Sequence, residues 1–186
     1  MSDILFAIWF FLPAGVANVV PILVAPLPII RGWNYPMDFH KTFKGKRILG
    51  DHKTWRGFIA GVIAAVFVFW LQQYLAGNIA IFESFVAAHN VDYVALPTLI
   101  VGALFGIGAL GGDAVESFFK RQRGTKPGDG WFPWDQTDYI IGGAIATAAF
   151  IRLSVLQYIW LILLWLIIHI VASYIGWLLK LKDKPL

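Results

Sequence analysis

The stretch GGDAVESFFKRQRGTKPGDGWFPWDQTDYIIGG, residues 111–143, contains the pattern from which the fold and the site of this chain are predicted. It leaves one apolar segment, crosses a basic, glycine-rich loop and enters a second apolar segment. Carboxylates stand at both boundaries, Asp113 and Glu116 before the loop and Asp135 and Asp138 after it. A carboxylate costs about 2.5–3.5 kcal/mol at the centre of a membrane helix and less near its ends. Acids placed there predict a partner, and the cations between them indicate a site for metal and phosphate.

Composition indicates a membrane protein of one domain, residues 1–186. The chain is 59% hydrophobic and only 14% charged, whereas soluble domains carry about 25% charged residues. It has no cysteine, which excludes disulfides, thiolate metal sites and a cysteine nucleophile. The first Lys or Arg is Arg31, so the N-terminal apolar segment lacks the charge pattern of a cleaved signal peptide. We assign the net charge of +4 to topology and anionic lipid, with no nucleic-acid partner.

Apolar runs predict an all-α, polytopic fold with five transmembrane helices. The predicted spans are Ile4–Ile30, Gly57–Ala76, Pro97–Phe119, Asp138–Leu153 and Leu156–Leu179. The fourth is only about 22 Å long, so it must thin the bilayer, extend through Gln157 or be partly re-entrant. Glycine pairs four residues apart in the second and third spans predict close contacts between helices.

The cations predict the orientation of these spans. Apart from Arg152, every Lys and Arg falls in the loop 31–56, in the loop 120–138 or in the C-terminal tail. Five crossings put these three regions on one side of the membrane, and the excess of cations makes that side cytoplasmic. We therefore expect the N-terminus outside and the C-terminus in the cytoplasm.

The acidic residues form two pairs with a spacing of three residues, which places both members of a pair on one helix face. Oxygen ligands without any cysteine favour a hard cation such as Mg²⁺. Asp138 has a second interpretation as a helix N-cap, stabilised by the helix dipole, and both stay open. The cap is a weaker explanation for Asp113, which precedes a full turn of apolar residues.

Two further polar groups have alternative interpretations. Asn18 precedes Pro21 in the first span, and it either makes an interhelical hydrogen bond or faces a substrate cavity. Lys53 and Arg56 lie in GDHKTWRG, at the predicted cytoplasmic mouth of the second span. They either anchor the helix on anionic headgroups or bind phosphate. Their position in the sequence beside Trp55 and Gly57 favours phosphate binding. The lone His169 is expected to be a hydrogen-bonded interhelical residue.

Longer motifs carry a resemblance to a known family. The segment Ser117–Tyr139 resembles the signature of phosphatidate cytidylyltransferases, and it is more similar to that of the short archaeal CDP-archaeol synthases. The archaeal resemblance extends to NVVP (Asn18–Pro21), KTWRG (Lys53–Gly57), GDxxxSFxKR (Gly112–Arg121) and DQTD (Asp135–Asp138). The longer bacterial and eukaryotic enzymes have a histidine–glycine–glycine stretch and an aspartate–arginine pair, which are absent here.

The resemblance implies a Mg²⁺-dependent reaction of CTP with 2,3-bis-O-geranylgeranylglycerol 1-phosphate that yields CDP-archaeol and pyrophosphate. It implies metal binding by Asp113, Asp135 and Asp138, and phosphate binding by Lys120 and Arg121, these five being the catalytic residues. The substrate-binding residues that it suggests are Asn18, Lys53, Thr54, Arg56, Glu116, Ser117 and Lys126. One alternative is a CDP-diacylglycerol synthase acting on phosphatidic acid. Another is a small membrane transporter, disfavoured because the acids gather on one side and no inverted repeat is visible.

Overall fold

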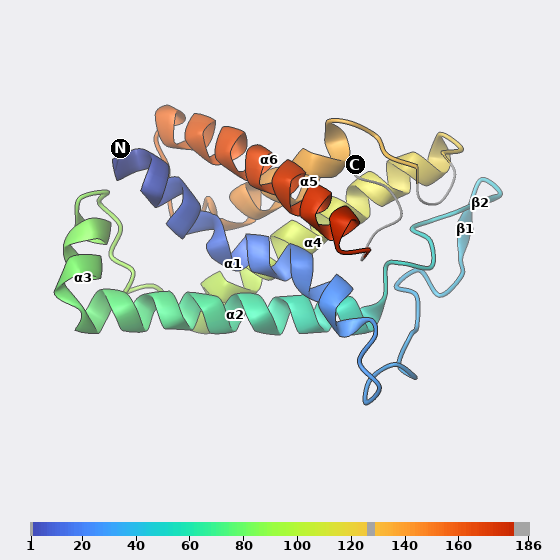
Figure 1. Ribbon diagram of the computed structural model, residues 1–186, viewed down its shortest axis with the longest axis horizontal. Coiled ribbons are helices and arrows are strands. Elements are labelled where there is room, and N and C mark those ends of the chain that lie inside the picture. Colours follow the sequence, from blue (N-terminus) through green and yellow to red (C-terminus); the bar gives the residue numbers. More distant parts are fainter. Residues whose placement is uncertain (1, 126–128, 181–186) are drawn as a thin grey trace.

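Helices account for most of the chain. The computed structural model describes residues 2–125 and 129–180 (Figure 1). In this part of the chain there are six helices: α1 (Ser2–Val24), α2 (Trp55–Asn78), α3 (Ala80–Ala87), α4 (Thr98–Gln122), α5 (Trp134–Thr147) and α6 (Val155–Leu178). Two short strands, β1 (Thr42–Phe43) and β2 (Lys46–Arg47), pair antiparallel in the loop between α1 and α2.

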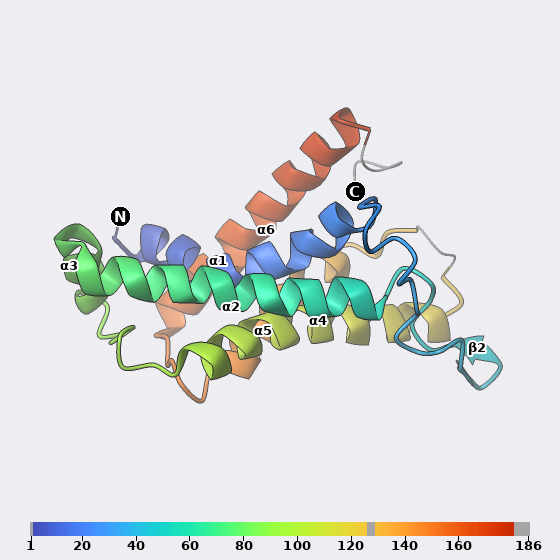
Figure 2. The ribbon, with the colours of Figure 1, turned by 90° about the horizontal axis from the view of Figure 1, so that it is seen from below.

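The long helices run along the molecule and alternate in direction (Figure 1). One end of the bundle gathers the C-terminal ends of α1, α4 and α6 with the N-terminal ends of α2 and α5. The hairpin lies at this end, and α3 lies at the opposite end beside the start of α1. Seen from below, α6 tilts away from α2 toward its C-terminal end (Figure 2). The alternation brings the loop before α2, the C-terminal end of α4 and the N-terminal end of α5 to one end of the bundle.

Four helices, α1, α2, α4 and α6, are long and apolar enough to cross a membrane, with mean hydropathies of 1.7–2.3. The remaining long element, α5, has 14 residues, which corresponds to about 21 Å against a hydrocarbon core of about 30 Å. The chain is therefore a polytopic helical membrane protein, as predicted. The fifth crossing stays a prediction, because α5 is shorter than a full span.

Several predicted boundaries were wrong. The first helix ends at Val24 rather than Ile30, because Pro26 and Pro28 follow and disfavour helical backbone before them. The stretch 77–96, which lies between the second and third predicted spans, contains the additional helix α3. The third helix continues to Gln122, since cations are favourable in the last turn of a helix. The short helix begins earlier than predicted, at Trp134, and ends at Thr147 instead of Leu153.

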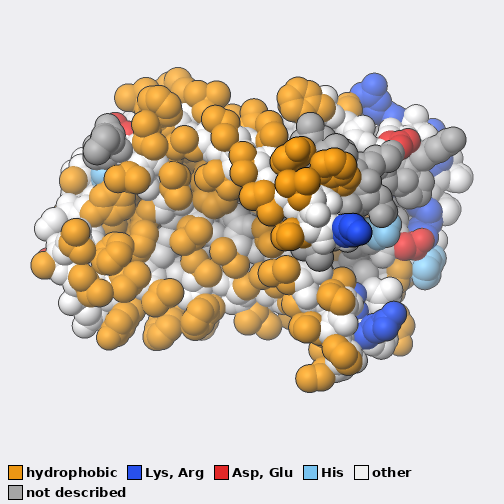
Figure 3. All heavy atoms as spheres, viewed as in Figure 1, with side chains coloured by type: hydrophobic (Ala, Val, Ile, Leu, Met, Phe, Trp, Pro, Cys, Tyr) orange, Lys and Arg blue, Asp and Glu red, His pale blue; other side chains and the backbone are white. Residues whose placement is uncertain are grey.

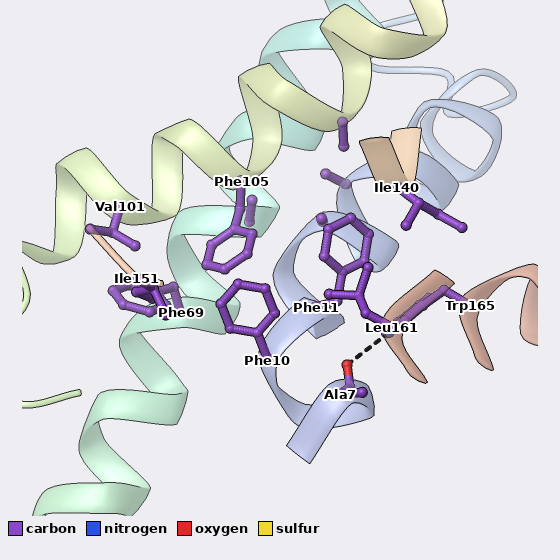
Figure 4. Close-up of a cluster of buried hydrophobic side chains, with 14 of the residues drawn as sticks. Ala7, Phe10, Phe11, Phe69, Val101, Phe105, Ile140, Ile151, Leu161 and Trp165 are labelled. Atoms are coloured by element: carbon purple, nitrogen blue, oxygen red, sulfur yellow. Dashed lines mark hydrogen bonds between the residues drawn. The ribbon is translucent and has the colours of Figure 1, made fainter. Parts of the chain in front are cut away.

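The core of the bundle is aromatic. Phe10 and Phe11 of α1 pack edge-on against Phe105 of α4, and Trp165 of α6 packs against Phe11 (Figure 4). The indole Nε1 of Trp165 donates to the carbonyl oxygen of Ala7 at 3.0 Å, which satisfies its polar atom. These edge-on ring contacts fix α1 between α4 and α6.

Charged side chains gather at the end of the bundle that carries the hairpin, while the rest of the same face is mostly hydrophobic (Figure 3). The hydrophobic surface includes Ile63 of α2, Ile145 of α5 and Ile167 of α6, each more than half exposed. Exposed apolar side chains over this length suit a hydrocarbon surrounding rather than water. On this face, most of the charged side chains therefore lie at one end.

Candidate active site

Close contact between α4 and α5 brings the two acidic pairs together. Gly108 and Gly112 of α4 face Gly142 and Gly143 of α5, and no side chain separates the two backbones there. A Cβ atom at Gly112 would collide with the carbonyl oxygen of Asp138. The glycine pair predicted to form a helix contact therefore does so, and the start of α5 lies beside the last turns of α4.

Three carboxylates converge at this contact. Asp113, Glu116 and Asp138 each offer an oxygen, and these oxygens lie within 4.8 Å of one another. Glu116 is only 8% exposed. Glu116 Oε1 and Asp138 Oδ2 are buried without a hydrogen-bond partner among the described residues. Like charges about 4 Å apart repel by about 4 kcal/mol at an effective dielectric constant near 20, so this group, called here the acidic cluster, suits a bound cation.

Lys53 reaches the acidic cluster from the loop that precedes α2. Its Nζ donates to Oδ2 of Asp113, sixty residues away in sequence. Burial by itself would lower the pKa of Lys53, but the carboxylates of Asp113, Asp138 and Glu116 outweigh burial and raise this pKa above its ordinary value. The ammonium group therefore stays charged and offsets part of the negative charge of the cluster.

The backbone around Lys53 is held by a short pairing with the preceding loop. Met37 N donates to the carbonyl oxygen of Lys53 at 2.7 Å, and Trp55 N donates to that of Tyr35 at 3.0 Å. The next residue, Thr54, caps α2, because its Oγ1 accepts from the amide of Gly57 at 3.2 Å. A helix N-cap and a backbone bridge thus fix where the lysine emerges.

A second lysine, Lys120 in the last turn of α4, binds the first turn of α5. Its Nζ lies 2.9 Å from both carboxylate oxygens of Asp135 and 3.6 Å from Glu116 Oε1. Asp135 also accepts from the backbone amide of Trp131 at 2.7 Å. Because both oxygens of Asp135 face this lysine, Asp135 lies beside the acidic cluster rather than within the group of three.

The loop before α2 is organised around Asp38, which is 6% exposed. Its carboxylate accepts from Arg47 Nε at 3.1 Å and Nη2 at 2.9 Å, and from the amides of Leu49, Gly50 and His40. Burial alone would raise the pKa of Asp38, but these hydrogen bonds outweigh it and hold the pKa far below its ordinary value of 3.8. Asp38 therefore stays ionised and fixes the segment that leads to Lys53.

Two adjoining cavities open beside the acidic cluster. The smaller, about 270 Å³, is lined by the cations Arg47, Lys53, Lys120 and Arg121, together with Ser117 and the acids Asp51, Asp113, Glu116 and Asp135. The larger, about 530 Å³, lies between α1, α2 and α6, and its polar lining includes Asn18, Thr54, Gln136, His169 and Ser173. His52, Lys53, Asp113 and Asp135 line both. The arrangement offers one compartment lined by both cations and acids and a second compartment with a mixed polar and apolar lining, and the two meet at Asp113.

The structure brings most of the predicted site residues together. Asn18 lines the larger cavity, in agreement with the cavity-facing interpretation, and His169 lines it with its ring 5.5 Å from that of Tyr139. Arg56 is buried elsewhere, donating to the carbonyl oxygens of Ile30 and Arg31 and to Asn34, so it supports the loop rather than the cavities. Lys126 lies outside the described residues.

Sequence reasoning missed Asp38 and Arg47 as a functional pair. The only signal was the presence of two acids, Asp38 and Asp51, in a loop that is rich in cations, and such a signal does not identify the cation that each acid binds. Asp138 Oδ1 accepts from the amide of Tyr139 at 2.6 Å, within the first turns of α5. Its other oxygen is buried beside Asp113 and Glu116. The N-cap interpretation of Asp138 was wrong, because α5 begins four residues earlier, at Trp134, and Pro133 precedes it.

Comparisons with known proteins agree on one family. The model of the CarS-like family, CDP-archaeol synthase, matches residues 1–186. A CDP-archaeol synthase of Thermofilum pendens is 36% identical over 94% of this chain and 77% of its own length. That of Thermococcus kodakarensis is 32% identical over 100% of this chain and 98% of its own. A solved structure of an intramembrane enzyme for archaeal membrane lipid biosynthesis is similar, with a TM-score of 0.69, 27% identity, and coverage of 91% of this chain and 94% of that chain.

Proposed function

We propose that this chain, which belongs to the CDP-archaeol synthase family, joins CTP to 2,3-bis-O-geranylgeranylglycerol 1-phosphate and releases pyrophosphate. The observation that carries this proposal is the meeting of three carboxylates with Lys53 and Lys120 where the two cavities join. A triphosphate and a lipid phosphate bring several negative charges to one place, and catalysis of such a transfer rests on positioning and charge stabilisation.

The acidic cluster fits a hard divalent cation such as Mg²⁺. Its donors are oxygens only, and two of them are buried without hydrogen-bond partners in the described part of the chain. Lys53 and Lys120 bring two positive charges against its three carboxylates. Asp113, Glu116 and Asp138 would hold the ion, which supplies positive charge against the triphosphate when bound. Asp135, predicted as a third ligand, is assigned here to positioning Lys120, and its role as a ligand stays a prediction.

The protein's own cations receive the phosphates. Arg47, Lys53, Lys120 and Arg121 line the smaller cavity, which therefore takes the triphosphate. An ionised oxygen of the lipid phosphate attacks the α-phosphorus of CTP, forming the new P–O bond. The bond from the α-phosphorus to the bridging oxygen breaks, and its electron pair leaves with pyrophosphate. Since the nucleophile is already ionised, the step needs no general base, and Lys120 and Arg121 offset the charge that develops on the leaving group.

The nucleoside of CTP is assigned to the larger cavity, whose lining mixes polar side chains with apolar ones such as Phe58 and Leu110. Sequence reasoning named no residue that reads the base. Selection of cytosine predicts little turnover with UTP, ATP or GTP, and equal rates with all four nucleotides would contradict the assignment.

The site is assigned to the cytoplasmic side, with five crossings, an external N-terminus and a cytoplasmic C-terminus. Support comes from the gathering of charged side chains at one end of the bundle (Figure 3) and from the alternating helix directions. A reporter that is active only in the cytoplasm, fused after Leu186, is expected to give signal. Signal only from a reporter that is active outside the cell would contradict the proposed topology with five crossings.

The decisive experiment incubates the purified, detergent-solubilised protein with labelled CTP and either the isoprenoid ether phosphate or phosphatidic acid. Labelled lipid product and stoichiometric pyrophosphate are expected with the ether lipid. Preference for phosphatidic acid would favour a CDP-diacylglycerol synthase. The absence of product with both lipids would contradict the proposed function and would favour the alternative of a small membrane transporter.

A further inference from the structure

An apolar groove of about 690 Å³ runs between α4 and α5. Its walls include Val115 and Phe119 of α4, Ile141 and Ile145 of α5, and two tryptophans, Trp131 and Trp134. Val115, Phe119 and Ile145 are more than half exposed, so the groove opens toward the surroundings of the bundle. It is separate from the two cavities described above, with which it shares only Glu116 among its lining residues.

The inner end of the groove reaches the acidic cluster. Glu116 and Asp138 line the groove, whereas Asp113 lines the two polar cavities. Among the described cavities, Asp113 is therefore reached only from the polar ones and Asp138 only from the groove, while Glu116 lines both the groove and the smaller polar cavity. Gly112 and Gly142 form part of the groove, and the absence of side chains at these positions lets it reach the carboxylates.

A cation also lines the groove, at the C-terminal end of α4. The guanidinium of Arg123 lies over the ring of Trp131, 4.8 Å from its centroid, and both residues line the groove. Any lipid-facing surface is apolar, but two carboxylates and a guanidinium at the end of an apolar groove are costly there without a function. The guanidinium, together with a cation held by the carboxylates, would match a ligand with an apolar body and an anionic head.

We propose that the groove between α4 and α5 binds one isoprenoid chain of the lipid phosphate, and that Arg123 receives its phosphate beside Glu116 and Asp138. This inference rests on the proposed function and adds the direction from which the lipid arrives. The nucleotide occupies the polar cavities and the lipid phosphate approaches from the other face of the acidic cluster. Such opposite approaches suit a displacement in which the attacking and leaving oxygens lie roughly in line.

Branched and aromatic walls suit a methyl-branched chain. From Asp138 to Ile145 the helix rises by about 10 Å, so the first part of the chain lies along α5 and the remainder extends into the membrane. A bulky side chain at Ile145 would fill the groove one to two turns away from the carboxylates, where it cannot touch the triphosphate.

The test substitutes Ile145→Trp and, from the opposite wall, Val115→Trp. The matched control is Ile63→Trp on α2, which is similarly exposed, at 63% against 71% for Ile145, and lines none of the described cavities. Each protein is assayed in mixed micelles at saturating CTP against the long-chain isoprenoid ether phosphate and a short-chain ether analogue with the same glycerol phosphate head.

Both groove variants are expected to raise KM for the long-chain substrate about tenfold, because filling a packed space forces displacement of the chain. KM for CTP and for the short-chain analogue should stay at the wild-type value, as should all constants of Ile63→Trp. An unchanged KM for the long-chain substrate would contradict the assignment of the groove to the isoprenoid chain. An equal rise in KM for the short-chain analogue would contradict it as well. If the wild-type protein itself fails to turn over either lipid, the proposed function fails instead.

Discussion

The two ends of the bundle handle polar groups in different ways. At the end that carries the hairpin, ionised side chains meet across elements far apart in sequence, as Lys53 and Asp113 do. At the opposite end, polar side chains mainly form hydrogen bonds with backbone groups. Gln73 Nε2 donates to the carbonyl oxygens of Tyr93 and Leu96, and Asp92 accepts from the amide of Ala95. One end therefore keeps charge available for a ligand, and the other uses polarity to hold the fold.

The largest expected difference between the ends concerns their aspartates. Asp113→Asn and Asp138→Asn keep the shape of the side chain but remove the charge that a divalent cation needs. We expect turnover to fall by more than about a hundredfold, a loss that even outer-shell partners of a metal reach, with normal extraction and thermal unfolding.

The control for this prediction is Asp92→Asn at the opposite end, where an asparagine makes the same local turn as an aspartate. Its turnover should equal that of the wild-type protein. CTP-dependent product formation at several Mg²⁺ concentrations measures all three variants. Near-normal rates for Asp113→Asn and Asp138→Asn would show that the acidic cluster takes no part in the reaction.

A smaller effect separates two roles within the charged end. If Asp135 positions Lys120, Asp135→Asn lowers kcat by about tenfold through the weaker neutral hydrogen bonds. The Mg²⁺ concentration for half-maximal rate should then stay unchanged. If Asp135 is a metal ligand, as the sequence predicts, that concentration rises as it does for Asp113→Asn. Rates measured across a Mg²⁺ titration distinguish the two, and a rise for Asp135→Asn would restore its role as a ligand.

The site was predictable in its chemistry but not in its pairing. The i, i+3 spacing indicates that Asp113 and Glu116 share one helix face, and the glycines indicate where α4 and α5 touch. Neither pattern tells that Lys53 binds Asp113 while Lys120 binds Asp135, since such pairs depend on where the loops place the helices. The result is that Glu116, expected to bind substrate, joins the acidic cluster.

The fold shows the same division between pattern and context. Hydropathy predicts α1, α2, α4 and α6 because each is a long apolar run. It misses α3, which at eight residues is too short to stand out from a loop and depends on packing against α1 and α2. The burial of Asp38 depends on left-handed backbone at Phe39, His40 and Lys44. Such backbone is uncommon for residues other than glycine and carries no clear local signature.

Asp38 provides a pH-dependent test of the charged end. Because its pKa is lowered on folding, the ionised form stabilises the loop above the ordinary carboxyl pKa. This stabilisation is lost progressively as the pH falls below about 4 toward the lower folded value. We expect Asp38→Asn to weaken this dependence and to raise KM for CTP about threefold to tenfold, since hydrogen bonds to a neutral acceptor are roughly half as strong.

Hydrogen exchange of the amides of residues 38–51, measured between pH 3 and pH 7, checks the Asp38 prediction together with KM. Asp51→Asn is the matched control, because Asp51 also binds Arg47 but its side chain is 70% exposed. That substitution should change the exchange of the loop amides much less. Equal protection of the loop in Asp38→Asn and in the wild-type protein would contradict the organising role of Asp38.

The smallest expected effect on turnover lies at the opposite end, at Gln73. Its Nε2 donates to the carbonyl oxygens of Tyr93 and Leu96 at 2.6 and 2.7 Å, and its Oε1 accepts from Thr98. Gln73→Leu leaves these groups without their partner, which should cost about 1–3 kcal/mol of stability. Turnover well below the unfolding temperature should not change, because no residue of the acidic cluster touches this network.

Thermal unfolding in detergent measures the stability effect, with Asn78→Ala as the control. Asn78 lies on the same helix and donates to a backbone carbonyl, that of Tyr74, but it is exposed. Its loss should therefore change stability by less than about 0.5 kcal/mol. If Gln73→Leu lowers kcat as strongly as it lowers stability, the two ends are coupled. Catalysis would then depend on how α2 and α4 are joined at the far end, and the separation between a ligand-binding end and a structural end would not hold.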